Sequence, residues 1–245
     1  MALISQEMRK LAPELDPLRI GTGWAPEDLE KVQVIIESTF GDSHPGSGHL
    51  DKLVEEVRKG VAQAGGHGAR YFATDICDGE SQGTDGINYS LASREMIANM
   101  IEIHANATPF DAGVYLASCD KGMPANLMGL ARVNIPSVVV PGGTMNAGPE
   151  MLTLEQLGKY SAQYERGEIN REKLDWAKCN ACPSCGACSF IDYGGGPGAC
   201  PAGKCADAGN QPGSSCVCLP GGAAGGAPCH NGGDAPSGYC HGGKL

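Results

Sequence analysis

The stretch that decides the fold is VQVIIESTFGDSHPGSGHLDKLVEEVRKGVAQAGG, residues 32–66. It opens with an apolar, β-branched run at residues 32–37, which is typical of a buried strand. A loop rich in Gly, Ser and Pro follows. Aliphatic residues then recur at three- and four-residue steps with charges between them, which predicts an amphipathic helix ended by Gly65 and Gly66. These aliphatic residues are Leu50, Leu53, Val54, Val57 and Val61. The stretch therefore predicts strand, loop and helix.

The same order of elements recurs further along the chain. Polar loops, CDGESQGTDGINY and CDKGM, follow two of the later strands, and Pro124 suits the first turn of a helix because its φ is fixed and it has no N–H. Alternating strands and helices with nearly continuous apolar strands predict an α/β fold with a parallel sheet covered by helices on both faces. In such sheets ligands bind beyond the carboxyl ends of the strands, where the polar loops fall. The later strands are predicted at residues 69–76, 112–118 and 136–143, and the helices at 93–105 and from Pro124.

Charge and length narrow the class of protein. The 245 residues include 28 acidic and 18 basic side chains, for a net charge of -10. An acidic chain has no electrostatic attraction to nucleic acid or to an anionic membrane surface, so we expect a small-molecule partner. The N-terminus has no uninterrupted apolar core of signal-peptide type, and no run approaches the roughly 18 apolar residues of a membrane span. We therefore expect a cytoplasmic protein.

The composition changes near the end of the chain. Residues 151–178 have the mixed charges of solvated helices. From Asp192 onward the chain is rich in Gly and Cys, has no periodicity and carries almost no large aliphatic residues, so it cannot bury enough apolar surface to offset the entropy of ordering. We expect one domain over residues 1–190 and a low-complexity tail over 191–245. We expect the tail to be disordered unless bound metal or disulfides hold it in one conformation.

Twelve cysteines without a signal peptide point first to metal or cluster ligation. Two of them open polar loops at predicted strand ends, Cys77 before Asp78 and Cys119 before Asp120. A thiolate is a soft ligand suited to iron–sulfur clusters or zinc, whereas a carboxylate is a hard ligand suited to Mg²⁺, so each pair can serve two metals side by side. A cysteine at Cys77 can equally be a small buried hydrophobe. At Cys119, which precedes two charged residues and a helix start, we favour a ligand.

A third feature is a run of four cysteines at three-residue steps: Cys179, Cys182, Cys185 and Cys188. Taken alone it resembles a ferredoxin-type cluster run, although those runs have a longer last gap followed by proline, and Ser189 stands here. Structural zinc is the other reading, which would need a second, separated pair of ligands. The run predicts a metal without deciding which cysteines bind it.

Four segments together carry a specific resemblance. The segments are SHPGSGHLDKL, CDGESQGTDGINYSLASRE, FDAGVYLASCDKGMPANLMGLARVNIPSVVVPGGTMNAG and CNACPSCGACSF. In this order and spacing they are similar to the dihydroxy-acid, phosphogluconate and aldonate dehydratases, and nearest to enzymes of pentonic acids such as xylonate. The resemblance covers roughly residues 30–190.

The resemblance implies two cofactors. Asp78, Asp120 and Lys121 match the family's Mg²⁺ ligands, the lysine as a carbamylated side chain, because an ammonium cannot ligate a cation. Cys119 and Cys188 match its iron–sulfur ligands. Gly46 stands where some members have a further cluster cysteine, so either Cys77 or an external ligand completes a cluster of [2Fe–2S] or [4Fe–4S] type. The cysteines at 179, 182 and 185 are then bystanders.

The family reaction removes water from a 2,3-dihydroxy acid or sugar acid to give a 2-keto acid. The resemblance implies that Mg²⁺ holds the substrate and that an open iron site assists the leaving hydroxyl, while a serine base and a further glutamate ligand come from a C-terminal domain of β-barrel type. Full-length members are expected to be homo-oligomers. No segment after Phe190 matches the serine or the glutamate. We therefore expect half of an active site and impaired activity.

Two alternatives stay open. One is a non-enzymatic iron–sulfur or zinc-binding protein, and the other is a misassembled product with an exposed apolar interface. His49 and the trio Ser93, Arg94 and Glu95 also lie in the family motifs, where packing and a helix start explain them equally well.

Overall fold

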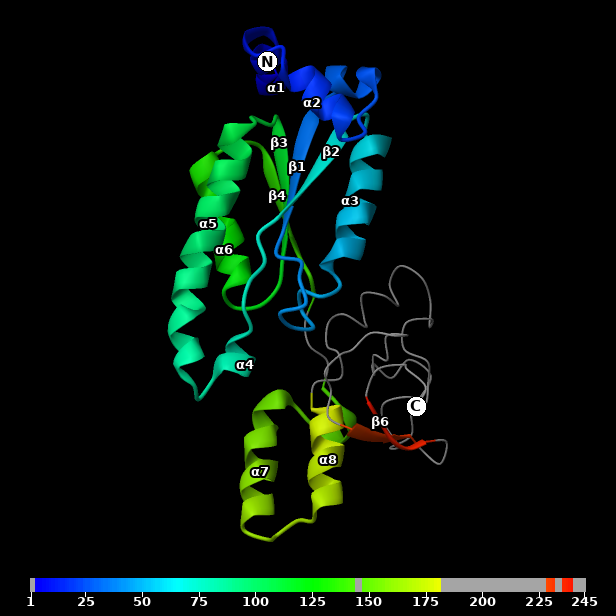
Figure 1. Cartoon of the computed structure of the whole chain (residues 1–245), viewed down its shortest axis with the longest axis vertical. Helices are drawn as coiled ribbons and strands as arrows, with labels where there is room; N and C mark the ends of the chain where they lie inside the picture. Colours follow the sequence, from blue (N-terminus) through cyan, green and yellow to red (C-terminus); the bar gives the residue numbers. More distant parts are fainter. Residues whose placement is uncertain (1–2, 144–146, 182–227, 232–234, 240–245) are drawn as a thin grey trace. The chain divides into compact units, whose positions relative to one another are not determined.

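The structure is a computed structural model that describes residues 3–143, 147–181, 228–231 and 235–239. Contacts divide the chain into two units, Met1–Gly142 and Gly143–Leu245, which are described separately. The first unit is built on a four-stranded sheet of order β2-β1-β3-β4 in which every pair is parallel (Figure 1). The α/β prediction is confirmed. The strands are β1 (Gln33–Ser38), β2 (His67–Phe72), β3 (Ala112–Ala117) and β4 (Ser137–Pro141).

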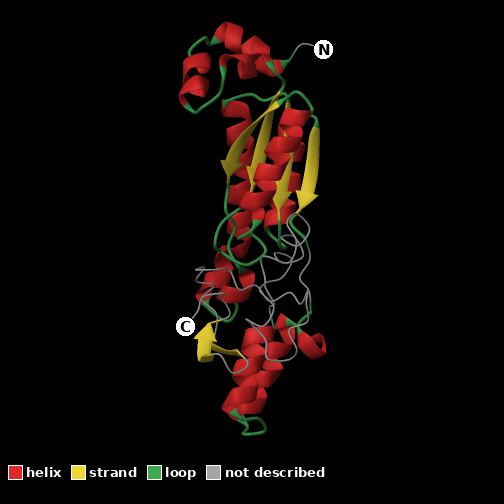
Figure 2. Ribbon diagram, turned by 90° about the vertical axis from the view of Figure 1, so that its right-hand side faces the viewer, coloured by secondary structure: helices red, strands yellow, loops and turns green. Residues whose placement is uncertain are grey.

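Helices cover both faces of this sheet, as the apolar strands predict (Figures 1 and 2). On one face α3 (Leu50–Gln63) contacts β1 and β2, while α5 (Ser90–Ala107) and α6 (Gly122–Val133) pack together on the other. Successive residues of β1 point to opposite faces. Ile35 accordingly packs in a buried cluster with Ala105 of α5, and Ile36 lies on the side of α3. Both side chains are fully buried.

The register of the strands brings their carboxyl ends to one edge. Ser38 at the end of β1 lies opposite Phe72 of β2 and Leu116 of β3, and Ala117 of β3 lies opposite Pro141. The loops that follow the strands therefore meet at this edge.

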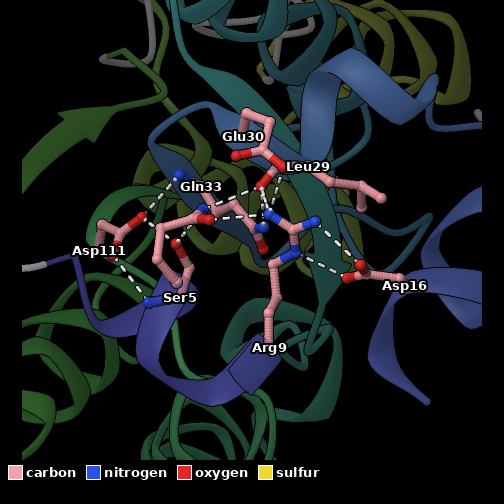
Figure 3. A network of polar contacts seen from close by, with 8 residues as sticks. Ser5, Arg9, Asp16, Leu29, Glu30, Gln33 and Asp111 are labelled. Carbon is pink, nitrogen blue, oxygen red and sulfur yellow. Dashed lines mark hydrogen bonds and ion pairs between the residues drawn. The ribbon is translucent and has the colours of Figure 1, made fainter. Parts of the chain in front are cut away.

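The opposite edge is held by the N-terminal segment. It contains α1 (Ile4–Leu11), α2 (Leu15–Gly21) and the short helix η1 (Pro26–Glu30). The Asp111 carboxylate, just before β3, accepts hydrogen bonds from the backbone N–H of Ser5 at 2.9 Å, the Ser5 hydroxyl at 2.6 Å and the Gln33 N–H at 2.8 Å (Figure 3). One carboxylate thus joins α1, β1 and β3.

Arg9 of α1 forms the second half of this network (Figure 3). Its guanidinium pairs in a fork with Asp16, through Nε at 2.7 Å and Nη2 at 2.9 Å, and it donates to the Leu29 carbonyl at 3.0 Å. Bidentate pairs of this kind are stronger and more directional than single contacts. Arg9 therefore fixes α1 against α2 and η1.

Several boundaries differ from the sequence prediction. Strand β2 ends at Phe72. The last backbone hydrogen bond between this segment and β1 is donated by the Ala73 N–H to the Ser38 carbonyl, and the chain then turns so that Asp75 becomes buried. The predicted polar loop 77–89 contains a short helix, α4 (Asp78–Ser81), and a 3-10 helix, η2 (Asp85–Tyr89). Helix α5 begins directly after them, three residues before the predicted start.

The second unit contains short helices and one hairpin. Helices α7 (Leu157–Glu165) and α8 (Arg171–Asn180) pack around Leu152, Ala177 and Ala181, and Asn170 caps α8 by accepting from the Lys173 N–H at 2.9 Å. The tail predicted to be disordered lies mostly outside the described residues. Across all described ranges, no helix is long and apolar enough to cross a membrane. The remaining elements are η3 (Pro149–Met151), η4 (Leu154–Gln156) and the antiparallel strands β5 (Pro228–Asn231) and β6 (Ala235–Tyr239).

Candidate metal centre

The candidate site lies at the carboxyl edge of the parallel sheet. The chain leaves β1 for β2 on one side and then crosses to β3 on the other, so the loops after β2, β1 and β3 are neighbours in space. A reversal of this kind is where α/β sheets bind ligands. The three loops contribute Asp75, Cys77 and Asp78, then Ser43, His44 and Ser47, then Cys119, Asp120 and Lys121.

Two carboxylates converge on the Lys121 ammonium. Its Nζ lies 2.5 Å from Asp78 Oδ2 and 2.9 Å from Asp120 Oδ2. Hydrogen bonds to Asp78 and then Asp120 raise the pKa of Lys121, and the bond to Lys121 lowers the pKa of Asp120. Asp78 is separated from Lys121 by 43 residues and reaches it only through strand pairing. Three predicted Mg²⁺ ligands are thus side by side.

The donor set fits a hard divalent cation. Asp78 Oδ1 is buried and has no hydrogen-bond partner among the described residues, so it has a lone pair to offer. Within the described ranges, no three His, Cys, Asp or Glu side chains are grouped to hold a metal. A carbamylated Lys121 would add a third oxygen ligand beside Asp78 and Asp120 and would replace the ammonium now between the carboxylates.

Two thiols lie beside these carboxylates. Cys119 has φ 65°, a left-handed conformation that is strained for a residue other than glycine, Asn or Asp, and its side chain is exposed. Cys77 is half-buried and precedes α4, and burial raises the pKa of its thiol. Both are free thiols. The third predicted cluster ligand, Cys188, lies outside the described residues, as do Cys182 and Cys185.

Sequence reasoning missed a buried network next to Cys119. His44 Nε2 lies 3.1 Å from Asp75 Oδ1, with the two side chains 4% and 0% exposed. Burial lowers the pKa of His44, but hydrogen bonds with Asp75 and Cys119 outweigh it and raise the pKa to about 10. His44 follows a predicted strand in a polar loop, which is the signal that could have identified it, whereas Asp75 fell inside the strand predicted over residues 69–76.

The other residues of the family motifs make structural contacts. His49 Nε2 lies 2.8 Å from the Gly142 carbonyl oxygen, which ties the loop after β1 to the end of β4. The Ser93 hydroxyl donates to the Ser90 carbonyl in the first turn of α5, and Arg94 pairs with its neighbour Glu95. These contacts agree with packing and helix-start roles.

Paired carboxylates and thiols at the carboxyl edge of a parallel sheet define a candidate ligand-binding domain of the α/β class. Comparison with protein families defines it further, since residues 31–192 match the family described as dihydroxy-acid/6-phosphogluconate dehydratase, N-terminal. The chain belongs to this family of hydro-lyases, which confirms the resemblance to dihydroxy-acid and phosphogluconate dehydratases read from the sequence.

Curated relatives agree with the family match. The chain is 39% identical over 170 residues to a dihydroxy-acid dehydratase of Ruminiclostridium cellulolyticum, covering 68% of this chain and 31% of the relative. It is 42% identical over 183 residues to one of Clostridium beijerinckii, covering 74% and 33%, and 36% identical over 182 residues to one of Akkermansia muciniphila, covering 73% and 32%. The match thus spans about a third of each relative's length.

Proposed function

We propose that this chain carries the metal-binding part of a hydro-lyase that converts a 2,3-dihydroxy acid or sugar acid, of xylonate type, into a 2-keto acid. The observation that carries the proposal is the convergence of Asp78 and Asp120 on the Lys121 side chain, beside the thiols of Cys77 and Cys119. The names of the curated relatives support the reaction class. The preference for a sugar acid rests on the sequence resemblance.

The proposed Mg²⁺ ligands are Asp78, Asp120 and Lys121 as its carbamate. The carbamate forms when the neutral lysine amine adds CO₂ and releases one proton, which exchanges a cation for an anion at the centre. Proposed iron–sulfur ligands are Cys119, Cys188 and Cys77. When bound, the two groups would supply Lewis acidity toward the substrate and its leaving hydroxyl.

The chain's own residues position these groups. Asp78 begins α4, in the segment after β2, and Asp120 follows β3, so the two proposed ligands come from two segments whose strands belong to one sheet. Asp120 also lies next to the N-terminus of α6, whose dipole favours its negative charge. The Lys121 ammonium pairs with both carboxylates and offsets their mutual repulsion when no divalent cation is present.

A metal titration tests the proposal. Mn²⁺, which has a paramagnetic signal, replaces Mg²⁺, and binding is measured in bicarbonate buffer by electron paramagnetic resonance. We expect Asp78→Asn to weaken binding at least about tenfold, because it removes a ligand. Asp85→Asn, an exposed carboxylate in the same stretch, is the matched control. Equal binding by Asp78→Asn and the wild-type chain would contradict the ligand assignment.

A second assay tests the chemistry. The chain is reconstituted anaerobically with iron, sulfide and Mg²⁺, and formation of 2-keto acid from xylonate and gluconate is followed. Iron content that depends on Cys119 supports the proposal. Iron that is lost in Cys182→Ser but kept in Cys119→Ser would instead favour the non-enzymatic cluster-binding alternative.

A further inference from the structure

A second buried polar cluster lies beside the candidate metal centre, and none of its residues has a role in the proposed function. It consists of His44 and Ser47, from the loop after β1, and Asp75, from the segment after β2. The His44 and Asp75 side chains are almost completely inaccessible to solvent. Burying an imidazole and a carboxylate costs more than packing apolar side chains in the same place, so such a pair is a candidate for a functional role.

Asp75 holds the imidazole by one nitrogen. His44 Nε2 lies 3.1 Å from Asp75 Oδ1 and 3.2 Å from the Ser47 hydroxyl. The same carboxylate oxygen accepts from the hydroxyls of Ser43 and Ser47, each at 2.9 Å. Asp75 is therefore fixed by three neighbours, and it fixes the orientation of the ring.

The remaining ring nitrogen, Nδ1, lies beside Gly46, the position where the sequence resemblance places a cluster cysteine in some family members. A Cβ at Gly46 would lie 3.0 Å from His44 Nδ1 and 3.1 Å from its Cε1, closer than ordinary contact allows. The Cys119 thiol, after Asp75, is a further cause of the raised pKa of His44, so the thiol and the imidazole are neighbours. With Nε2 engaged by Asp75, Nδ1 is the nitrogen left for a group bound at Cys119.

We propose that His44 is itself a ligand of the iron centre at Cys119, through Nδ1, and that Asp75 is the positioning residue that receives its Nε2–H. Metal-ligating histidines almost always donate their second ring N–H to a carboxylate or carbonyl, which is the arrangement seen here. Imidazole and thiolate are both suitable ligands for iron, and mixed Cys and His ligation raises the reduction potential of a cluster. This inference rests on the proposed function and adds a residue to the same centre.

Spectroscopy of the whole chain tests the inference without an activity assay. The chain is labelled with ¹⁵N-histidine, reconstituted anaerobically with iron and sulfide and reduced. We expect the strong ¹⁵N hyperfine coupling of a directly bound nitrogen in pulsed electron paramagnetic resonance. His44→Cys should keep its iron, lose this coupling and have a lower midpoint potential, because a thiolate replaces a neutral imidazole. His67→Gln, at the opposite edge of the sheet, should leave the coupling unchanged.

The outcomes separate this inference from the proposed function. Iron bound by the wild-type chain with only the weak coupling of a hydrogen-bonded nitrogen, or a strong coupling that persists in His44→Cys, overturns the ligand role while the cluster proposal stands. A wild-type chain that binds no iron overturns both. Asp75→Asn should raise the midpoint potential, because a negative charge behind the imidazole is removed, and an unchanged potential would contradict the positioning role of Asp75.

Discussion

Cys119 combines an exposed thiol with a strained backbone, which is a residue-scale property that composition and spacing do not reveal. A left-handed φ costs a residue with a Cβ roughly 1 kcal/mol or more, and such strain persists where surrounding structure enforces it, most often at functional sites.

We predict that Cys119→Gly is more stable than Cys119→Ala by about 1 kcal/mol. Glycine adopts φ 65° without a Cβ clash, whereas alanine keeps the clash and also lacks the thiol. Urea denaturation of both variants, free of metal, measures the difference. Equal midpoints would show that the backbone relaxes without cost.

Asp28 gives the first unit a defined acid sensitivity. The Lys31 ammonium, the Ala25 N–H and His67 surround its carboxylate and lower its pKa from 3.8 to about 2, against a smaller opposing effect of burial. Because the folded-state pKa is depressed, the resulting stability is present above about pH 4 and is lost as the pH falls through 2.

We predict that Asp28→Asn removes this acid-sensitive contribution, which is about 1 kcal/mol after screening by solvent. Urea midpoints compared between pH 2 and pH 5 should converge for the variant and the wild-type chain at the acid end and diverge toward pH 5. Lys31→Met removes the largest cause of the lowered pKa of Asp28, so its urea midpoint should differ from that of the wild-type chain in the same direction. Parallel curves over this range would contradict the assignment.

At the scale of elements, two helical glycines have opposite surroundings. A Cβ on Gly129 of α6 would lie 2.6 Å and 2.8 Å from Ile101 side-chain atoms, so this glycine allows α5 and α6 to approach closely. A Cβ on Gly60 of α3 would meet nothing within 4 Å. Comparing an alanine substitution at each glycine therefore separates the packing effect of the added methyl group from its effect on helix propensity.

We predict that Gly129→Ala lowers the free energy of unfolding by about 1–3 kcal/mol through overpacking. Gly60→Ala should raise it by about 0.5–1 kcal/mol, because alanine restricts the unfolded chain and favours the helix. Thermal unfolding followed by circular dichroism measures both changes. Two shifts of the same sign would refute the close approach of α5 and α6.

The elements themselves were largely predictable from local pattern. The strands that became β1, β3 and β4 and the helix α3 follow directly from period and β-branched content. The sequence did not predict α1 and α2, whose contacts depend on Asp111 and Arg9 of the folded chain. It also extended β2 beyond Phe72, because the burial of Asp75 in a polar network is not visible in local pattern.

At the scale of the whole first unit, the strand order of the sheet determines how strongly each strand's backbone amides are protected from hydrogen exchange. Strand β1 is paired on both sides and buried at every position, whereas β4 lies at the edge, and Val138 is 59% exposed. Amides open to exchange through local unfolding most readily where few buried contacts oppose it.

We predict that backbone amides of β1 exchange with deuterium much more slowly than those of β4. Hydrogen exchange measured by mass spectrometry, with peptides covering residues 33–38 and 137–141, checks this. Equal protection of the two strands would mean that β4 is covered by another part of the chain or by a second copy.

Sequence alone determined the α/β class, the polar loops at strand ends and, through its motifs, the dehydratase family, because period, turn chemistry and residue type are local properties. Only the tertiary structure decided which loops meet. Parallel pairing of β1 with β2 and β3 brings Asp78 to Lys121 and places His44 and Asp75 behind Cys119. Residues far apart along the chain become neighbours because burial and strand register act over the whole sheet.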